Sequence, residues 1–457
     1  MRLSELNRVV DGVLRGADVE FATVSIDTRT LQPGDLFIAI AGQRFDGHDF
    51  VARAATAGAC AAMVERPLAL DLPQLVVADA RLALGRLGAA WRQRNAVRVV
   101  GVTGSNGKTT AKEMIAAVLG VNDPVLKTRG NLNNDLGVPL TLLQLKPGHR
   151  YAVIEMGANH PGEIAYVAGL AKPDVAVITN AGAAHLEGFG SREGVAKAKG
   201  EIIACLSHDG VAILNADDGF IGLWREIAGL RRVVTFGFGV DADVRGVPES
   251  VRVVYGDDGF ETCFECLYKG IRYEMRLRLA GRHNVANALA TAAACLALDI
   301  GIEQIAEGLA RVPPVPGRMQ PERGANGALF INDAYNANPS SFKAALDVLL
   351  ELPGEPWVAL GAFGELGAAS AELHAELGRQ AKAMGVVRLF ATGPDADRAV
   401  ETFGAGALYC REHEEMIRKL RENLREDVVV LVKGSRSQRM DRVVEALCQS
   451  GRESTCC

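Results

Sequence analysis

The feature that most limits the fold of this chain is a repeated alternation between two kinds of segment. Short runs of β-branched and other apolar residues alternate with longer stretches rich in Ala and Leu along most of the 457 residues. Apolar runs of roughly four to eight residues between helical stretches are typical of βα units, whose parallel strands are buried under helices. The sequence therefore predicts an α/β protein with mostly parallel sheets.

The alternation falls into three series, and these predict three domains. We expect a small N-terminal α/β domain over 1–80, a central domain over 81–312 and a C-terminal α/β domain over 313–457. At about 150 residues per domain, the length agrees with this division. The run 312–317, VPPVPG, separates the last two series, because proline lacks the N–H that a helix needs.

The predicted elements can be given by residue number. Strands are expected over 35–40, 61–64 and 74–77, then 97–103, 151–156, 175–180, 211–215 and 233–236, and finally 328–332, 357–360, 388–392 and 428–432. Helices are expected over 81–94, 284–298, 341–350 and 413–424. Between 241 and 279 polar and apolar residues alternate around glycine-containing turns, which predicts antiparallel strands.

Composition excludes several classes of function. The 50 basic and 55 acidic residues give a net charge of −5, so we expect no nucleic-acid partner. The apolar run 285–298 is shorter than the roughly 20 residues that span a bilayer, so we expect no membrane insertion. Residues 1–16 are too charged for a signal peptide, and nine scattered cysteines fit reduced thiols, which together predict a cytoplasmic location. The pair Cys263 and Cys266 has no second cysteine pair nearby, so zinc is not expected.

The strongest chemical signal is the sequence VVGVTGSNGKTT over residues 99–110. A buried strand leads into a glycine-rich turn and then into a helix that begins near Lys108. Gly104 and Gly107 allow backbone N–H groups to point at phosphate oxygens, the Lys108 ammonium adds a full positive charge, and Thr109 offers a hydroxyl to Mg²⁺. The spacing is the short form G-x-x-G-K-T. It predicts a nucleoside triphosphate site made by Gly104, Ser105, Asn106, Gly107, Lys108, Thr109 and Thr110.

Three polar residues follow the next strands. Glu155 ends the strand candidate that begins at Tyr151, where one carboxylate together with Thr109 would suffice for Mg²⁺. His185 follows the strand at 175–180, and Lys199 lies on the next helix. Taken alone, His185 is typical of a structural histidine and Lys199 of a solvated helix surface.

Together these residues resemble the Mur ligase family of ATP-dependent amide-bond-forming enzymes. The phosphate loop, Glu155, His185 and Lys199 match signatures of its central domain. Residues 130–139, 317–320 and 333–340 resemble the branch of the family that adds a dipeptide. Residues 33–37 and 46–50 resemble the N-terminal uridine-nucleotide domain of that branch, and 433–436 match a motif near its C-terminus. The resemblance implies a central P-loop-type domain and a Rossmann-like C-terminal domain. It also implies a monomer.

The resemblance implies one reaction. D-alanyl-D-alanine would be joined to a UDP-N-acetylmuramoyl-tripeptide through an acyl phosphate, with ATP as substrate and Mg²⁺ as cofactor. The products would be the UDP-muramoyl-pentapeptide precursor of peptidoglycan, ADP and phosphate. Neither the third residue of the acceptor peptide nor the base that takes the amine proton follows from the sequence.

The resemblance also implies roles for single residues. Lys108 and the loop glycines would hold the β- and γ-phosphates, Thr109 and Glu155 one Mg²⁺, and His185 a second. Lys199 would be carbamylated, which would turn its cation into an anion that can hold metal. The remaining assignments are adenine to Asn284 and Asn287, phosphate to Arg318, ribose to Asp333, UDP to Asp27, Arg29 and His48, and other substrate contacts to Asn131, Asn133, Asn134, Tyr335, Asn336 and Asn338.

Two stretches of the chain depart from the sequence pattern of this branch. The branch usually carries Gly-Asp-Met before Glu-Leu-Gly, whereas residues 361–367 read GAFGELG and keep only Glu365; Thr28 stands where the branch prefers Ser.

Another Mur ligase, such as the diamino-acid-adding one, or a folylpolyglutamate synthetase would share the phosphate loop. Residues 1–80 count against the folate enzyme, and 333–339 favours the dipeptide-adding branch. A nucleotide-gated interaction module would leave the 333–339 motif unexplained, and a kinase would leave the phosphate on its product.

Overall fold

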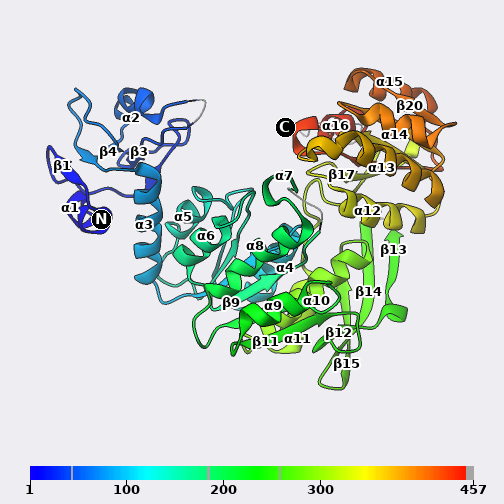
Figure 1. Ribbon diagram of the computed structural model, residues 1–457, viewed down its shortest axis with the longest axis horizontal. Coiled ribbons are helices and arrows are strands. Elements are labelled where there is room, and N and C mark those ends of the chain that lie inside the picture. The colour runs from blue at the N-terminus through cyan, green and yellow to red at the C-terminus, as the bar shows by residue number, and fades with distance from the viewer. Residues whose placement is uncertain (43–44, 183–185, 257–258, 449–457) are drawn as a thin grey trace, which may run out of the picture.

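The computed structural model describes residues 1–42, 45–182, 186–256 and 259–448. Within these residues the strands form three sheets, which lie in separate parts of the molecule (Figure 1). The long helix α3, Ala80–Gln93, runs from the N-terminal sheet to the central part, and the C-terminal sheet lies on the other side of the central part. The α/β class predicted from the alternation is confirmed.

The N-terminal sheet has the strand order β1-β5-β4-β3-β2, with β1 antiparallel and the others parallel. Its elements are α1 Leu3–Val10, β1 Val13–Arg15, β2 Val24–Ser25, β3 Leu36–Ile38, η1 Gly47–Phe50, α2 Val51–Thr56, β4 Ala61–Val64 and β5 Gln74–Val76. Leu84 and Leu87 of α3 join the apolar core of this sheet. The other face of α3 reaches the central part, where Arg81 forms an ion pair of 2.5 Å with Asp135.

The central sheet has the order β13-β14-β12-β11-β10-β9-β6-β8-β7, and β15 pairs with β14. Its strands are β6 Arg98–Thr103, β7 Val125–Lys127, β8 Tyr151–Glu155, β9 Val175–Ile178, β10 Val211–Asn215, β11 Arg232–Gly237, β12 Val244–Gly246, β13 Arg252–Gly256, β14 Gly259–Tyr268 and β15 Ile271–Leu277. Its helices are α4 Lys108–Leu119, α5 Gly137–Leu142, α6 Glu163–Ala171, α7 Leu186–Phe189, α8 Arg192–Ala204, α9 Ile221–Ala228, η2 Pro248–Ser250, α10 Arg282–Leu296 and α11 Ile302–Ala310.

The parallel part of this sheet is buried on both faces. Val100 and Val102 of β6 point into one apolar layer with α4 and α10, while Val99 points into the opposite layer with α6 and α8. Alternate residues of a strand face opposite sides, so a continuous apolar run such as β6 requires two covering layers. The predicted antiparallel strands over 241–279 are confirmed for β12 to β15, although β12 also pairs in parallel with β11.

The C-terminal sheet has the order β16-β17-β21-β18-β19-β20, and only its pair β16–β17 is antiparallel. Its strands are β16 Gln320–Arg323, β17 Leu329–Asp333, β18 Glu355–Gly361, β19 Arg388–Thr392, β20 Ala407–Tyr409 and β21 Val428–Lys433. Its helices are η3 Ala325–Gly327, α12 Pro339–Glu351, η4 Gly367–Ala369, α13 Ser370–Met384, α14 Ala396–Phe403, α15 His413–Asn423, η5 Arg436–Gln438 and α16 Asp441–Cys448. Two apolar cores lie on opposite faces of this sheet.

The sheets span 13–76, 98–277 and 320–433, so the predicted divisions at residues 80 and 312 fall between them. Their positions as domain boundaries stay a prediction. No helix among the described residues combines the length and apolar character needed to cross a membrane.

Candidate active site

A cavity of about 730 Å³ lies where the central and C-terminal domains meet. It is lined by the loop between β6 and α4, residues 131, 133 and 134, the start of α10, the loop between β17 and α12, and residues 433 and 435–437. β6, β8, β17 and β21 all end at this cavity, and the carboxyl ends of parallel strands are where α/β proteins place ligands. The geometry therefore defines one composite site shared by two domains.

The phosphate loop has the predicted strand–turn–helix form. β6 ends at Thr103 and α4 begins at Lys108, with Gly107 at a φ of 82° just before the helix. A Cβ on Gly107 would collide with Asn287 Oδ1, and one on Gly104 with Thr179 Oγ1, so both positions require glycine. Lys108 Nζ donates to Gly104 O at 2.7 Å, which folds the ammonium group back over the loop.

Burial lowers the pKa of Lys108, an effect that Glu155 opposes and Arg318 reinforces. The ammonium group therefore lies in a place that favours a strongly anionic neighbour. A polyphosphate would supply that charge, because phosphate oxygens accept hydrogen bonds from Lys and from the N-terminus of a helix such as α4.

Glu155 is the last residue of β8 and is only 2% exposed. Its Oε1 accepts a hydrogen bond from Asn133 Nδ2 at 2.9 Å, and its Oε2 lies 3.9 Å from Lys112 Nζ. Oε2 is buried without a hydrogen-bond partner among the described residues. A buried carboxylate oxygen of this kind is normally bonded, so it fits the ligand set of a hard cation.

Lys199 is buried, at 2% exposure, in α8, with Nζ 5.3 Å from the centre of the Phe189 ring. The reading of this residue as part of a solvated helix surface is therefore wrong. Burial, reinforced by the like charge of Lys108, lowers the pKa of Lys199 to about 7. A large fraction of its amine is neutral near neutral pH, which is the state that reacts with carbon dioxide. His185 lies outside the described residues.

Asn284 and Asn287, in the first turns of α10, line the cavity beside the phosphate loop. Both are buried, and Asn287 Nδ2 donates to Asn284 Oδ1 at 3.3 Å. Asn284 Nδ2 donates to Ala280 O at 2.8 Å, which fixes its orientation. The structure brings this pair to the site; that they contact adenine stays a prediction.

The C-terminal domain contributes a guanidinium group to the phosphate loop. Arg318 Nη2 donates to Thr109 Oγ1 at 3.0 Å, and the same guanidinium carbon lies 4.4 Å from the centre of the Tyr335 ring. Asp333, at the end of β17, forms an ion pair with Lys433 and accepts from Met319 N at 3.2 Å. Lys433 Nζ also donates to Asn336 O at 3.2 Å.

A second contact joins the two domains through amide groups. Asn338 Nδ2 donates to Asn106 Oδ1 at 2.7 Å, and Asn106 Nδ2 donates to Ser340 Oγ at 2.9 Å. Asn338 is also the N-cap of α12, where its side chain accepts from Ser341 N. The start of α12 is thereby held against the phosphate loop. Asn131, Asn133 and Asn134 complete the predicted set that lines the cavity.

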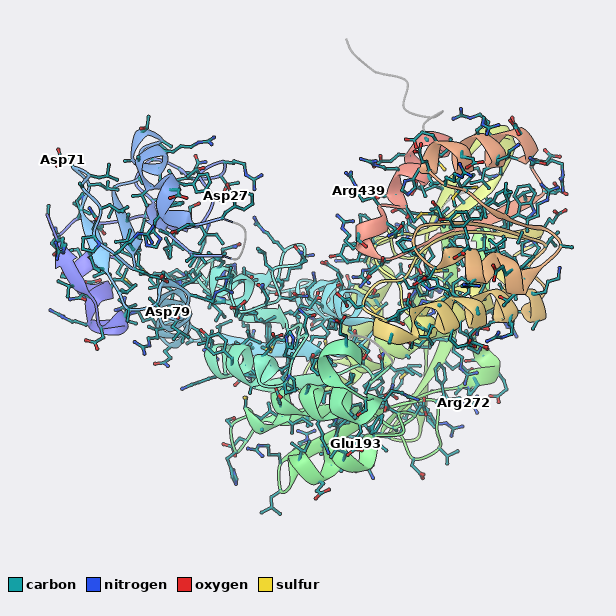
Figure 2. The ribbon with its side chains drawn as sticks, turned by 45° about the horizontal axis from the view of Figure 1, so that its top comes forward. Asp27, Asp71, Asp79, Glu193, Arg272 and Arg439 are labelled. Atoms are coloured by element: carbon teal, nitrogen blue, oxygen red, sulfur yellow. The ribbon has the colours of Figure 1, made fainter. Side chains whose placement is uncertain are left out.

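The three residues predicted for UDP lie apart from this cavity, in the N-terminal domain. Figure 2 shows Asp27 on the side of that domain that faces the C-terminal domain, opposite Arg439. Arg29 forms an ion pair of 2.6 Å with Asp27 and lowers the pKa of that carboxyl to about 2. The His48 ring is buried between Asp46, at 2.6 Å from Nδ1, and the backbone N–H of Glu65, which donates to Nε2 at 2.9 Å. His48 thus has no ring nitrogen free for a ligand in this conformation.

Sequence reasoning gave no role to several residues that the structure places at or beside the cavity. Lys112 comes one helical turn after Lys108, so their positions on one face of α4 could have drawn attention to it. Lys433 and Arg436 belong to the motif at 433–436, which was matched without assigning roles. Arg192 and Asp218 lie in no motif and could not have been found from local sequence.

Comparison with protein families matches three descriptions along the chain. They are the Mur ligase family catalytic domain over 20–117, the Mur ligase middle domain over 102–295, and the Mur ligase glutamate ligase domain over 317–436. The chain belongs to the Mur ligase family.

Full-length relatives define the branch. UDP-N-acetylmuramoyl-tripeptide–D-alanyl-D-alanine ligase of Escherichia coli strain K12 is 44% identical over 98% of each chain, and the Bacillus subtilis strain 168 ligase of the same name is 37% identical over 93% of each. Among solved structures, MurF of Acinetobacter baumannii has a TM-score of 0.91 and 38% identity, with 98% of each chain covered. MurF of Thermotoga maritima in complex with ADP has a TM-score of 0.84 and 30% identity, covering 95% of this chain and 99% of that one.

These relatives confirm the predicted dipeptide-adding branch, so the chain is an ATP-dependent ligase of that branch. A folylpolyglutamate synthase structure from Mycobacterium tuberculosis, at 16% identity and a TM-score of 0.64, shares the fold alone. The alternatives of a folate enzyme, a sibling ligase and a nucleotide-gated module are therefore set aside.

Proposed function

We propose that this chain uses ATP to join D-alanyl-D-alanine to a UDP-N-acetylmuramoyl-tripeptide through an acyl phosphate, with the cavity between the two domains as the reaction site. The observation that carries the proposal is the meeting of Lys108, Glu155 and Arg318, from two domains, in one cavity. Such a site gathers cations and a metal-binding carboxylate around one polyphosphate. The full-length relatives named above support the choice of substrates.

In this proposal the residues around the phosphate loop bind the nucleotide. Lys108 and the loop glycines Gly104 and Gly107 would hold the β- and γ-phosphates. Asn284 and Asn287 would face the adenine, and Asp333 would bind the ribose. The carboxylate of Asp333 forms an ion pair with Lys433 in this structure, so a ribose hydroxyl would have to compete with Lys433 for it.

Glu155 and Thr109 would hold Mg²⁺, and this assignment is supported by the buried Oε2 of Glu155, which accepts no hydrogen bond from the described residues. The bound ion would neutralise charge on the phosphates. A second magnesium site on His185 and a carbamylated Lys199 remain part of the proposal. The lowered pKa of Lys199 supports carbamylation, because only the neutral amine forms an N–C bond to carbon dioxide, releasing one proton.

The chain's own residues act on two steps. A carboxylate oxygen of the tripeptide attacks the γ-phosphorus, the bond to the bridging oxygen breaks, and ADP leaves. The amine of the dipeptide then attacks the acyl carbonyl, phosphate leaves, and the amine loses a proton. Negative charge gathers on oxygens near Lys108 and Arg318 in both steps, and preorganised cations stabilise such charge.

The N-terminal domain would bind the uridine nucleotide, with Asp27 and Arg29 as contacts; His48 is not carried into this proposal. The roles of the three domains, a monomeric state and a cytoplasmic location are proposed with it. The test is ADP formation by the purified chain with UDP-muramoyl-tripeptide, with D-alanyl-D-alanine, and with both. Sustained turnover only with both supports the ligase; equal turnover with neither would refute it.

A further inference from the structure

We propose that Arg436 binds the free carboxylate of the dipeptide and so selects D-alanyl-D-alanine over dipeptides without a C-terminal charge. This inference rests on the proposed function. It adds a binding group for the amine substrate on the C-terminal domain, at a residue to which the motif comparison assigned no role.

Arg436 lines the cavity from the short helix η5, directly after β21. Its guanidinium carbon lies 5.1 Å from the centre of the Tyr335 ring, the ring that Arg318 also contacts. The backbone before it is fixed, because Ser435 Oγ donates to Ala362 O at 2.9 Å. The contact with the Tyr335 ring and the fixed backbone at Ser435 therefore orient the Arg436 side chain, which remains exposed and lines the cavity.

Two neighbouring cations already have polar partners among the described residues, whereas the contact of Arg436 is with an aromatic ring. Lys433 is paired with Asp333, and Arg318 donates to Thr109 on the phosphate loop. In the described part of the chain, no carboxylate forms an ion pair with Arg436; its contact is the face of Tyr335. Arginine stacked on an aromatic ring keeps its N–H groups free for bidentate binding of a carboxylate.

The dipeptide offers a carboxylate that such a group could bind. Its amine must reach the acyl phosphate beside Thr109 and Arg318, while its carboxylate takes no part in the bond formed. An extended dipeptide spans at most about 7 Å. Arg318 and Arg436 contact one ring, so their separation is on the same scale as the distance between the two ends of the substrate.

The test compares D-alanyl-D-alanine with its C-terminal amide, using ADP formation by the full chain with saturating ATP and UDP-muramoyl-tripeptide. We expect the parent chain to prefer the free acid in kcat/KM by about 10- to 100-fold, the range for a hydrogen bond to a charged group. In Arg436→Gln that preference falls to within about two-fold of unity, through a higher KM for the acid, with the KM for ATP unchanged. Arg436→Lys, which keeps the charge, retains part of the preference.

Arg439→Gln is the matched control, because Arg439 is an exposed arginine three residues later, at the domain surface shown in Figure 2. It should keep the parent's preference. An unchanged acid-to-amide ratio in folded Arg436→Gln would overturn the inference while leaving the ligase intact. A raised KM for ATP with an unchanged ratio would assign Arg436 to the nucleotide instead. A parent chain inactive with both amines would overturn the proposed function, and this inference with it.

Discussion

Arg318 donates a hydrogen bond from Nη2 to Thr109 Oγ1, across the boundary between the C-terminal and central domains. Thr109 follows the phosphate-loop lysine directly, so the two domains meet at the atoms that would surround the transferred phosphoryl group. The hydroxyl is also the one proposed to face Mg²⁺. Catalysis in this account therefore depends on how the C-terminal domain sits on the phosphate loop.

We expect Arg318→Gln to lower kcat by about 100- to 1,000-fold, the usual effect of removing one preorganised donor at a developing oxyanion. Lysine should not restore activity, because it cannot both stack on Tyr335 and reach Thr109. Steady-state ADP formation measures this. Arg323→Gln is the control. Arg323 ends the edge strand β16, and its guanidinium group lies over the ring of Tyr255. Equal losses in both variants would show a general effect on the domain.

Glu155→Gln should raise the Mg²⁺ concentration needed for half-maximal activity by about 10-fold or more, because a neutral amide is a weaker ligand for a hard cation. Calorimetric titration of ADP with and without Mg²⁺ gives a second readout that does not depend on turnover. Glu193→Gln serves as control, since Glu193, labelled in Figure 2, is an exposed acid. It forms an ion pair with Lys197. An unchanged Mg²⁺ requirement in Glu155→Gln would remove this residue from the metal site.

Lys199 predicts a pH dependence of stability. Its folded-state pKa is about 7 against an ordinary value of 10.5, so between these pH values the unfolded chain binds more protons. Stability contributed by this group therefore rises with pH from about 7 to about 10 and is lost below about 7. In buffer free of carbon dioxide, Lys199→Met should flatten the rise of Tm between pH 7 and 9, whereas Lys197→Met should not. The idea fails if both variants keep the parent's slope.

Gly107→Ala should abolish nucleotide binding, because the new Cβ would meet Asn287 Oδ1 at a backbone φ of 82°. Gly148 provides a control that has the backbone strain without the steric collision. Its φ is 102°, but no atom lies within 4 Å of a Cβ built there. Gly148→Ala should cost about 1–2 kcal/mol of stability and leave ADP binding intact. Calorimetry measures the ADP affinity of both variants. An ADP affinity in Gly107→Ala equal to that of the parent chain would contradict the packing described for the loop.

The elements that sequence predicted and those it missed differ in their place in the sheets. Buried strands such as β6 and β21 carry continuous apolar runs and were found at nearly the right residues. The strands that were missed, β1, β2, β7, β16 and β20, all lie at sheet edges. Edge strands are short and half-solvated, so they lack the apolar run. β16 reads QPER, and its proline is tolerated because an edge strand leaves one side unpaired.

The candidate site divides in a similar way. Lys108 and Glu155 were found because a loop or a strand end carries a local signal. The burial of Lys199 and the engagement of His48 depend on helices and backbone far away in sequence, which no local pattern encodes. Contacts such as Asn106 with Asn338 join residues 232 positions apart, so only the fold reveals them.

The most direct test of the account follows oxygen atoms. The carboxylate of the UDP-muramoyl-tripeptide that accepts the dipeptide is labelled with ¹⁸O, and the phosphate released with ATP and D-alanyl-D-alanine is analysed by mass spectrometry. The account predicts one ¹⁸O atom in each phosphate released, because the acyl phosphate oxygen leaves with phosphorus. Phosphate free of label, formed while the pentapeptide product accumulates, would contradict it.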